Sequence, residues 1–375
     1  MKKLAILGAS YLQLPLVKKG KEMGIYVICF AWDDGKAICK NYADAFYDIS
    51  VLEKELILEK CKEEKIDGIL TVATDICVPT IAFIAKELNL VGNSVDCALK
   101  TTNKGFMRKS FQDSNILSPN YKVVKSTNDT NLLNLKFPLI VKPSDRSGSL
   151  GVIKVESLNN LEKAIQYCIE VSLEKSAIVE EYITGKEVSV ETISWQGRHS
   201  IITITDKTIT KEPYFVELAH HQPSQLPTKI QEEIINTSLQ ILEATGVKNG
   251  ASHIELKIQP DDGVYVIELG SRMGGDFIGS DLVPLSTGFD YLQAVIDIAL
   301  NQFDGKVEKT LNKFSGVYFL SENTKKLLPY FGNFKSSEFE IVKKELQNPV
   351  LKEIHNSNDR SGYLIFQSTK KVNLL

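Results

Sequence analysis

The sequence predicts a protein of mixed α/β and α+β class, with a parallel α/β domain at the N-terminus and mainly antiparallel strands after it. Strand-like apolar runs alternate with helix-like segments over residues 1–100, which is typical of a parallel sheet covered on both faces by helices. Farther along, two strand-like runs are joined by a Pro-Asp-Asp-Gly turn at residues 260–263, which predicts an antiparallel hairpin. A chain of 375 residues with 43% hydrophobic residues can form two or three domains.

The first hundred residues provide strands and helices in alternation. Strands are expected over residues 3–8, 25–31 and 68–73, and helices over residues 15–23, 53–64 and 79–88. Gly24 is the expected end of the first helix.

A glycine follows the first expected strand, as it does in dinucleotide-binding domains. The G-x-G-x-x-G pattern is absent, however, because position 10 is serine and position 13 is glutamine. Asp33 and Asp34 follow the second strand, where such domains place a ribose-binding acid. An NAD-dependent oxidoreductase therefore remains an alternative, but the pattern favours a sheet that forms one wall of a cleft.

A compact segment is expected over residues 121–184. The helix that precedes it, residues 101–113, begins with a threonine that can cap its N-terminus. Within the segment, strands are expected over residues 137–142, 151–155 and 177–179. Apolar residues at 158, 161, 164, 165, 168 and 169 follow the period of a helix.

Antiparallel strands and helices are expected over residues 185–300. An amphipathic helix covers residues 230–245 and stops at Gly246. The hairpin strands cover residues 253–258 and 264–269. The remaining residues, 310–375, are expected to form a small α+β region.

Composition argues against several classes of protein. The net charge of −3 gives no global reason to bind nucleic acid or an anionic membrane. No apolar run approaches the roughly 18 residues that span a bilayer. The six cysteines form no C-x-x-C pair, which favours a reduced protein of the cytoplasm over a zinc or disulfide framework.

The hairpin carries the first group of chemically interesting side chains. His253, Glu255 and Lys257 alternate with apolar residues and so share one face of their strand. Glu268 is expected to end the otherwise apolar face of Val264 on the next strand. Two neighbouring carboxylates repel each other unless a cation lies between them, and Mg²⁺ is often held by one or two carboxylates together with phosphate oxygens. Two exposed acids on a surface hairpin are the alternative interpretation.

Two glycine-containing loops have the chemistry of anion cradles. Arg272 lies four residues after Glu268 and is followed by Gly274 and Gly275, whose backbone amides can approach an anion closely. Lys142 ends an expected strand and precedes the loop Ser147-Gly148-Ser149. This order differs from the P-loop, in which the lysine follows the glycines. Taken alone, the second loop favours a mobile serine-glycine hairpin over a phosphate cradle.

The motifs together resemble the ATP-grasp superfamily of ATP-dependent carboxylate–amine or carboxylate–thiol ligases. Five weak motifs occur in the order and with the spacing of that superfamily, and the resemblance covers residues 1–305 well and the rest loosely. The matching stretches are Asn103-Lys104, Ile140 to Pro143, Val179 to Ile183 with Gly185 to Glu191, His253 to Glu255, and Ile267 to Gly275.

The resemblance assigns roles in nucleotide binding. The residues concerned are Lys104, Lys142, Ser147, Gly148, Ser149, Glu180, Glu181, Ile183 and Glu187. The two lysines would reach the ATP phosphates, the backbone of Glu181 and Ile183 would bind the adenine edge beside Glu180, and Glu187 would hold the ribose.

The resemblance also assigns the metal and the reacting groups. Glu255 and Glu268 would bind Mg²⁺ or Mn²⁺, and Arg272 would stabilise the reacting phosphoryl and tetrahedral groups. Substrate contacts would come from His253, Ser271, Gly274 and Gly275. Many members carry asparagine two residues after the second metal acid, where this chain has Gly270, so the number of bound ions is open. The version found here is similar to that of L-amino-acid ligases.

The resemblance implies an ATP-grasp fold in three parts. These are an N-terminal Rossmann-like domain over residues 1–100, an ATP-grasp domain over residues 101–305 with a lid over about 121–184, and a C-terminal α+β subdomain over residues 306–375. The implied reaction converts a carboxylate into an acyl phosphate and joins it to an amine, with release of ADP and phosphate. The expected partners are small-molecule acids and amines, and a homodimer is compatible with the resemblance.

Three alternatives remain at this point. An ATP-grasp enzyme can instead activate bicarbonate, as carboxylases and carbamoyl phosphate synthetase do. The other two alternatives are the oxidoreductase described above and a non-catalytic protein that kept the fold. The presence of both lysines, both metal acids and Arg272 favours the ligase over the non-catalytic protein.

Overall fold

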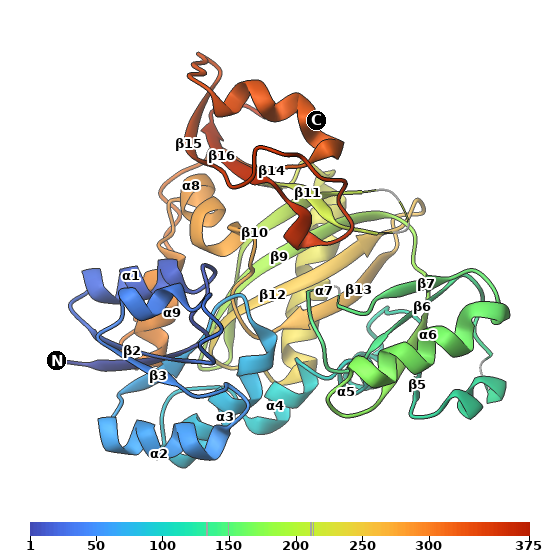
Figure 1. Cartoon of the computed structure of the whole chain (residues 1–375), viewed down its shortest axis with the longest axis horizontal. Coiled ribbons are helices and arrows are strands. Elements are labelled where there is room, and N and C mark those ends of the chain that lie inside the picture. Colours follow the sequence, from blue (N-terminus) through green and yellow to red (C-terminus); the bar gives the residue numbers. More distant parts are fainter. Residues whose placement is uncertain (133, 149, 211, 213) are drawn as a thin grey trace.

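The computed structural model describes residues 1–132, 134–148, 150–210, 212 and 214–375. A four-stranded parallel sheet in the order β3-β2-β1-β4 forms the N-terminal part. Its strands are β1 (Lys3–Leu7), β2 (Tyr26–Ala31), β3 (Ala45–Asp48) and β4 (Gly68–Leu70). The helices of this part are α1 (Leu14–Glu22), α2 (Lys54–Glu64), α3 (Val78–Glu87) and α4 (Val95–Lys100), at the blue end of Figure 1. The parallel sheet predicted from the alternating pattern is confirmed.

The loop after β1 is filled by a side chain of the protein itself. Gly8 has a positive φ of 91°, and a Cβ atom there would lie 3.0 Å from the side chain of Gln13. Gln13 is buried and donates hydrogen bonds to Val72 O (2.7 Å) and Thr74 Oγ1 (2.9 Å). The space in which a dinucleotide fold holds its pyrophosphate is therefore occupied by Gln13, which argues against the NAD alternative.

An antiparallel sheet of eight strands crosses the middle of the molecule in the order β13-β12-β9-β10-β11-β14-β16-β15 (Figure 1). Its strands are β9 (Lys186–Trp195), β10 (Arg198–Ile209), β11 (Glu217–Gln222), β12 (Gly250–Ile258), β13 (Val264–Gly270), β14 (Phe314–Leu320), β15 (Phe339–Leu346) and β16 (Gly362–Ser368). The last three strands thus continue the same sheet as the predicted hairpin, although they belong to the C-terminal region.

Helix α7 (Thr228–Thr245) covers one face of this sheet and leaves the other for the cleft. Ile234 and Ile241 of α7 belong to one buried cluster with Ile254 and Leu256 of β12. Side chains alternate along a strand, so the polar residues of β12 lie on the opposite face. The predicted stop is confirmed, because Gly246 ends the helix in the left-handed conformation at φ 74°.

The segment expected to form the lid contains a separate antiparallel sheet in the order β5-β8-β6-β7, seen in green in Figure 1. Its elements are β5 (Tyr121–Val124), β6 (Leu139–Pro143), β7 (Ile153–Val155), α6 (Leu158–Val171) and β8 (Ala177–Glu181). Leu161, Ile165 and Cys168 of α6 pack into the lid core, as their helical spacing predicted.

Helix α5 (Lys104–Asp113) lies between the N-terminal part and the lid. The predicted helix start at residue 101 was wrong, because Asn103 caps α5 by accepting from the amides of Gly105 (3.0 Å) and Phe106 (3.3 Å). Thr101 instead follows α4 and bonds Cys97 O. The strand predicted over residues 68–73 also ends early, at Leu70, because the chain then turns toward the cleft.

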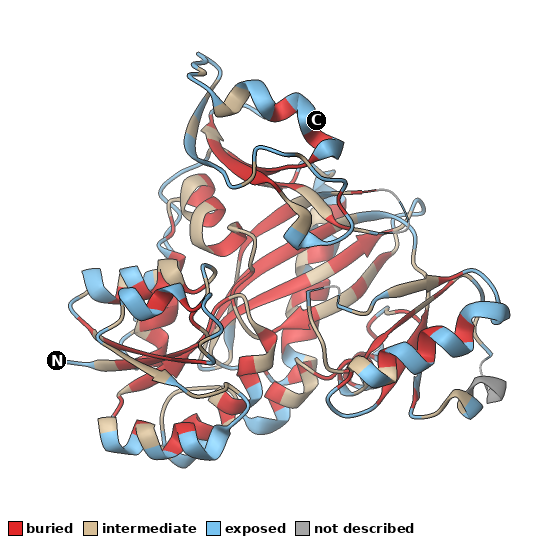
Figure 2. Cartoon of the chain, viewed as in Figure 1, coloured by how far each residue is buried: buried red, intermediate tan, exposed pale blue. Residues whose placement is uncertain are grey.

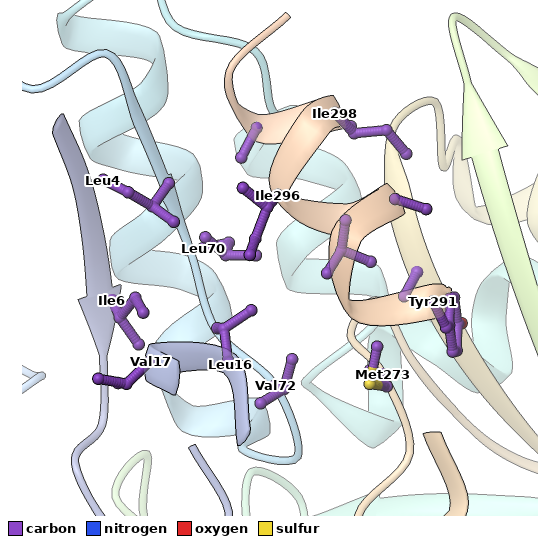
Figure 3. Close-up of a cluster of buried hydrophobic side chains, with 14 of the residues drawn as sticks. Leu4, Ile6, Leu16, Val17, Leu70, Val72, Met273, Tyr291, Ile296 and Ile298 are labelled. Carbon is purple, nitrogen blue, oxygen red and sulfur yellow. The ribbon is translucent and has the colours of Figure 1, made fainter. Parts of the chain in front are cut away.

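A shared core joins the N-terminal part to the central sheet. Leu4 and Ile6 of β1 and Val17 of α1 lie in one cluster with Ile296 of α9 (Tyr291–Ala299) and Met273 (Figure 3). Figure 2 shows the same burial along the strands of both sheets. The short helix α8 (Val283–Thr287) precedes α9. None of the described helices combines the length and the hydropathy of a membrane-spanning segment.

Candidate active site

A cleft of about 450 Å³ lies where the N-terminal part, the lid, the central sheet and the C-terminal region meet. Most of the residues predicted for the site line it together: Lys104, Lys142, Ser147, Gly148, Glu180, Glu181, Ile183, Glu187, His253, Glu255, Glu268, Arg272 and Gly275. Ser271 and Gly274 are not among its lining residues, and Ser149 lies outside the described residues. Motifs that are separated by more than 160 residues in the sequence therefore converge on one cavity.

Glu255 and Glu268 stand directly opposite each other on β12 and β13. The expectation that Glu268 continues the face of Val264 was wrong, because the strand register shifts between the pairs Glu255–Glu268 and Leu256–Val266. Ile267 is the extra residue of this bulge, so Val264 and Val266 stay in the core while Glu268 turns into the cleft. The bulge is what brings the two carboxylates to the same face.

Each of these two carboxylates is paired with a lysine. Lys207 Nζ lies 3.0 Å from Glu255 Oε1, and Lys104 Nζ lies 3.0 Å from Glu268 Oε1. Burial would raise the pKa of Glu255, but Lys207 and His253 hold that pKa well below its usual value. Burial likewise opposes the charge of Lys207, yet Glu255 and Glu217 raise its pKa. Both groups of the Lys207–Glu255 pair are therefore ionised in the cleft.

Lys142 and Glu180 form a second buried pair at the lid side of the cleft. Lys142 Nζ lies 2.7 Å from Glu180 Oε2, and Arg108 Nε of α5 lies 2.7 Å from Glu180 Oε1. Burial lowers the pKa of Lys142. Burial opposes ionisation of Glu180 as well, but Arg108 and Lys142 lower its pKa. The carboxylate of Glu180 is thus engaged by two cations and holds Lys142 at the cavity wall.

The two lysines reach the cleft from neighbouring segments. The amide of Lys104 donates to Ser144 O (2.7 Å), just after β6, and its Nζ donates to Arg146 O in the glycine-containing loop. Lys104 is 3% exposed and Lys142 5% exposed. Two ammonium groups that are nearly removed from solvent but face one cavity form a suitable environment for a polyanion.

The end of β8 offers backbone groups to the cleft. The amide of Glu181 donates to Asn120 O (3.0 Å), so of its two backbone groups the carbonyl is the one that can meet a ligand. Among the described residues, the amide of Ile183 donates to no backbone acceptor. Glu187 lines the same end of the cavity and pairs with Lys257 Nζ at 3.0 Å.

His253 is held by a buried carboxylate on the next strand. His253 and Glu191 are paired across β12 and β9, and His253 Nδ1 contacts Glu191 Oε1. The other oxygen of Glu191 accepts from the amide of Gly274 (3.0 Å). Burial would lower the pKa of His253, but Glu191 and Glu255 raise it to about 9. The amide of Gly274 is therefore engaged by Glu191. Ser271, the other predicted substrate contact that does not line the cleft, forms a hydrogen bond between its Oγ and Thr101 Oγ1 (2.8 Å).

Several residues in or next to the cleft were missed by the sequence analysis. Asp75 of the N-terminal part contacts Arg272, with Oδ2 2.7 Å from Nη2. Arg360 of the C-terminal region pairs with Asp276 Oδ2 at 2.8 Å and with Glu217 Oε2 at 3.2 Å. Only Lys207 had a visible signal, because it is a charged residue inside the strand-like run from Ile201 to Ile209.

The sequence of this chain is similar to those of an ATP-grasp domain family and of known ligases. The ATP-grasp domain family matches residues 135–281. The alanine–anticapsin ligase of Bacillus amyloliquefaciens is 27% identical over 297 residues, which cover 69% of this chain and 62% of that ligase. This chain thus spans less than two thirds of that relative.

Solved structures share the fold of nearly the whole chain. An L-amino acid ligase from Bacillus licheniformis superposes with a TM-score of 0.77 at 22% identity, covering 99% of this chain and 94% of the other. A phosphoribosylglycinamide synthetase from Anaerococcus prevotii has a TM-score of 0.73 at 23% identity, covering 98% and 94%. Residues 135–281 of this chain thus match the ATP-grasp domain, nearly the whole chain shares the fold of these enzymes, and the predicted motifs converge on one cleft.

Proposed function

We propose that the protein is an ATP-dependent carboxylate–amine ligase. The observation that carries the proposal is the single cleft in which a pair of opposed carboxylates, two buried lysines and an arginine face one another. An acyl phosphate forms when a carboxylate oxygen attacks the γ-phosphorus of ATP and ADP leaves. The amine then attacks the carbonyl carbon, phosphate leaves, and an amide is formed.

ATP would lie between the lid and the central sheet. Lys104 and Lys142 would contact its phosphates from α5 and β6, and Gly148 would let the loop backbone approach them, since its φ is 64° and a Cβ there would meet open space. The carbonyl of Glu181 and the amide of Ile183 offer an acceptor and a donor of the kind that the adenine edge requires. Glu187 would hold the ribose hydroxyls.

The residues present fit a divalent cation that is shared with phosphates. Glu255 and Glu268 are opposed on adjacent strands, and the described residues contain no cluster of three or more acidic, histidine or cysteine side chains that could hold a metal by themselves. One or two carboxylates together with phosphate oxygens are the usual environment of Mg²⁺ in such enzymes, and Mn²⁺ suits the same ligands. The bound ion would neutralise charge on the transferring phosphoryl group.

Arg272 and the lid would supply the remaining catalytic effects. Interactions that strengthen as charge develops lower the barrier selectively, and the buried Arg272 lines the same cavity as the carboxylate pair. A lid closed over the nucleotide would keep water from the acyl phosphate, which hydrolyses readily.

The names of the relatives guide the choice of substrates. Among proteins similar to this chain are an alanine–anticapsin ligase and an L-amino acid ligase. We therefore infer small-molecule acids and amines of the amino-acid type as substrates. The six cysteines are free thiols, which supports a reducing compartment such as the cytoplasm. A homodimer is compatible with this function.

The test is a screen for ADP release in the presence of Mg²⁺ and ATP. Pairs of carboxylic and amino acids are supplied together and singly, and bicarbonate is included as a competing acid. The ligase predicts ADP that depends on both an acid and an amine. ADP formed with bicarbonate alone would favour the carboxylase alternative, and AMP as the nucleotide product would exclude the acyl-phosphate route.

A further inference from the structure

The Asp75–Arg272 contact joins the N-terminal part of the chain to the reacting end of the cleft. Asp75 lies between β4 and α3, whereas Arg272 follows β13, and the two are 197 positions apart. Both side chains are largely buried, at 11% and 13% exposed. Asp75 Oδ2 accepts from Arg272 Nη2 at 2.7 Å, so one carboxylate fixes one edge of the guanidinium.

The backbone around Asp75 is fixed by contacts with both parts. The amide of Ala73 donates to Met273 O (3.0 Å), the residue that follows Arg272. Ala73 has a φ of 61°, a left-handed conformation that non-glycine residues adopt only where their surroundings require it. Gln13 holds the next turn through Thr74 Oγ1 (2.9 Å). Asp75 is therefore presented to Arg272 by a docked segment and not by a free loop.

Gly270 leaves the space into which Asp75 fits. A Cβ atom on Gly270 would lie 2.4 Å from Asp75 Oδ1 and 3.1 Å from Arg272 Cζ. An alanine at position 270 cannot coexist with the present position of the carboxylate, and the absence of a side chain at this position is thus matched to the presence of Asp75. Among the described residues, Oδ1 has no hydrogen-bond partner and Arg272 Nε has none either.

We propose that Asp75 is a positioning residue that orients the Arg272 guanidinium toward the reacting carboxylate, and that Gly270 is required because Asp75 occupies its side-chain space. The inference rests on the proposed function in that Arg272 acts on the reacting groups. In this proposal Asp75 acts through Arg272 and not on the reacting groups themselves. In this way the N-terminal part contributes to the chemical step through an ion pair.

The first test follows Arg272 directly and needs no turnover. The Nε–Hε resonance of Arg272 is recorded by NMR in the intact protein and assigned by its loss in Arg272→Ala. In Asp75→Ala this resonance is expected to shift and to exchange faster with water, whereas Asp75→Asn, which keeps an acceptor oxygen, gives an intermediate change. Asp44→Ala removes another ion-paired acid of the N-terminal part, that of Lys21, and should leave the resonance unchanged. An unchanged Arg272 signal in Asp75→Ala overturns the proposal, whether or not the protein makes ADP.

The second test is kinetic. Asp75→Ala is expected to lower kcat about 10- to 100-fold, the range typical of outer residues that orient a functional group, with KM for ATP within about twofold of wild type. In an Arg272→Ala background the same substitution should change kcat less than about threefold, because its effect passes through the arginine. Equal losses in both backgrounds would mean a merely structural role and overturn the proposal.

Substitution of Gly270 provides a third, independent test of the proposal. Gly270→Ala should reproduce the kcat loss of Asp75→Ala. Adding Gly270→Ala to Asp75→Ala should cost little more, because the 2.4 Å clash with the carboxylate is then gone and only the 3.1 Å contact with Arg272 Cζ remains. If the two losses multiply in the double variant, position 270 acts independently of Asp75 and that part of the proposal is wrong.

Discussion

Cations that face the cleft are each held beside a carboxylate from another segment. Lys142 contacts Glu180, Lys104 contacts Glu268, and Lys207 contacts Glu255. Buried charges are costly unless they are paired, so these lysines stay ordered in the absence of a ligand. Under the proposed function, Lys104 and Glu268 would exchange each other for phosphate and metal when a triphosphate and a divalent cation bind.

Lys104→Ala should weaken ATP binding about 10- to 150-fold. The substitution removes one cation from a poorly solvated phosphate site, and hydrogen bonds to charged groups contribute about 1.5–3 kcal/mol. Lys109→Ala is the matched control, because Lys109 lies on the same helix, is exposed, and pairs with Asp113 away from the cleft. Calorimetric titration with a non-hydrolysable ATP analogue measures the effect. Equal affinities for the two variants would contradict a phosphate role for Lys104.

Glu268→Gln should lower turnover at least about a hundredfold without unfolding the protein. The amide keeps the size of the side chain but removes the charge that a divalent cation needs, and it also releases Lys104. The measurement is ADP release at saturating ATP over a range of Mg²⁺ concentrations. Turnover that is insensitive both to this substitution and to chelation would remove the metal assignment. Glu243→Gln, on the far end of α7, should behave as wild type.

The buried imidazole of His221 should lower the free energy of unfolding at acidic pH. Burial against Tyr318 and Phe366 lowers its pKa to about 4 from the ordinary value of 6.5. In the unfolded chain the His221 imidazole takes up a proton near pH 6.5, whereas in the folded chain it does so only near pH 4. The free energy of unfolding therefore falls as the pH drops from about 6.5 to 4. The contribution is about 3 kcal/mol at most.

Denaturant unfolding from pH 7 to pH 4 checks this expectation. Any stability difference between wild type and His221→Gln at pH 7 should shift in favour of the variant as the pH falls, because the variant has no proton to gain. His355→Gln serves as the control, since His355 is 52% exposed. A difference that does not change with pH would contradict the expectation.

At the level of single elements, local sequence patterns were sufficient for most helices and strands. The helical spacing in α6, the stop at Gly246 and the hairpin turn all depend on neighbouring residues, and the structure confirms them. The bulge at Ile267 was missed because it depends on a long-range bond: the amide of Val266 donates to Leu117 O. Helix α5 begins after Asn103 and not after Thr101. The amide of Lys104, its first residue, donates to Ser144 O in the lid, which is another long-range bond.

The lid offers a prediction at the same scale. Gly151 has a φ of 77°, and a Cβ there would lie 2.9 Å from Pro143, the residue after Lys142. Gly151→Ala should strain the β6–β7 connection by about 1–3 kcal/mol and weaken ATP binding several-fold. Gly197→Ala imposes similar strain at φ 81° but meets open space on another hairpin. It should lower stability and leave ATP binding unchanged. ATP affinities that fall equally in both variants would contradict a local effect on Lys142.

Across the whole molecule, the cleft is assembled from segments that only the tertiary fold brings together. Lys142, Glu255, Glu268 and Arg272 lie within recognisable local motifs, so the sequence sufficed to predict them. Asp75 lines the cleft and Arg360 contacts the lining residues Asp276 and Glu217, but neither Asp75 nor Arg360 lies in a motif. Their positions depend on the docking of the N-terminal part onto Met273 and on the pairing of β16 with β14, which local sequence does not encode.

The C-terminal region is part of the central sheet and contacts the loop that follows Arg272. Strands β14, β16 and β15 extend the central sheet, and Arg360 contacts Asp276 of the loop that follows Arg272. Asp276 and Phe277 both have positive φ values, of 50° and 66°, and the ring of Phe277 lies tilted against that of Tyr363 of β16, with the ring centroids 4.3 Å apart. The C-terminal strands thus hold the turn that closes one end of the cleft.

The central claim is that a carboxylate is activated by transfer of the γ-phosphoryl group of ATP, and oxygen labelling tests it most directly. An acid substrate from the ADP screen is supplied with ¹⁸O in its carboxylate, together with ATP, Mg²⁺ and the amine. An acyl phosphate intermediate transfers one labelled oxygen to phosphate, so the account predicts phosphate heavier by one ¹⁸O for each amide formed, with ADP as the nucleotide. Unlabelled phosphate, or ¹⁸O found in AMP, would contradict it.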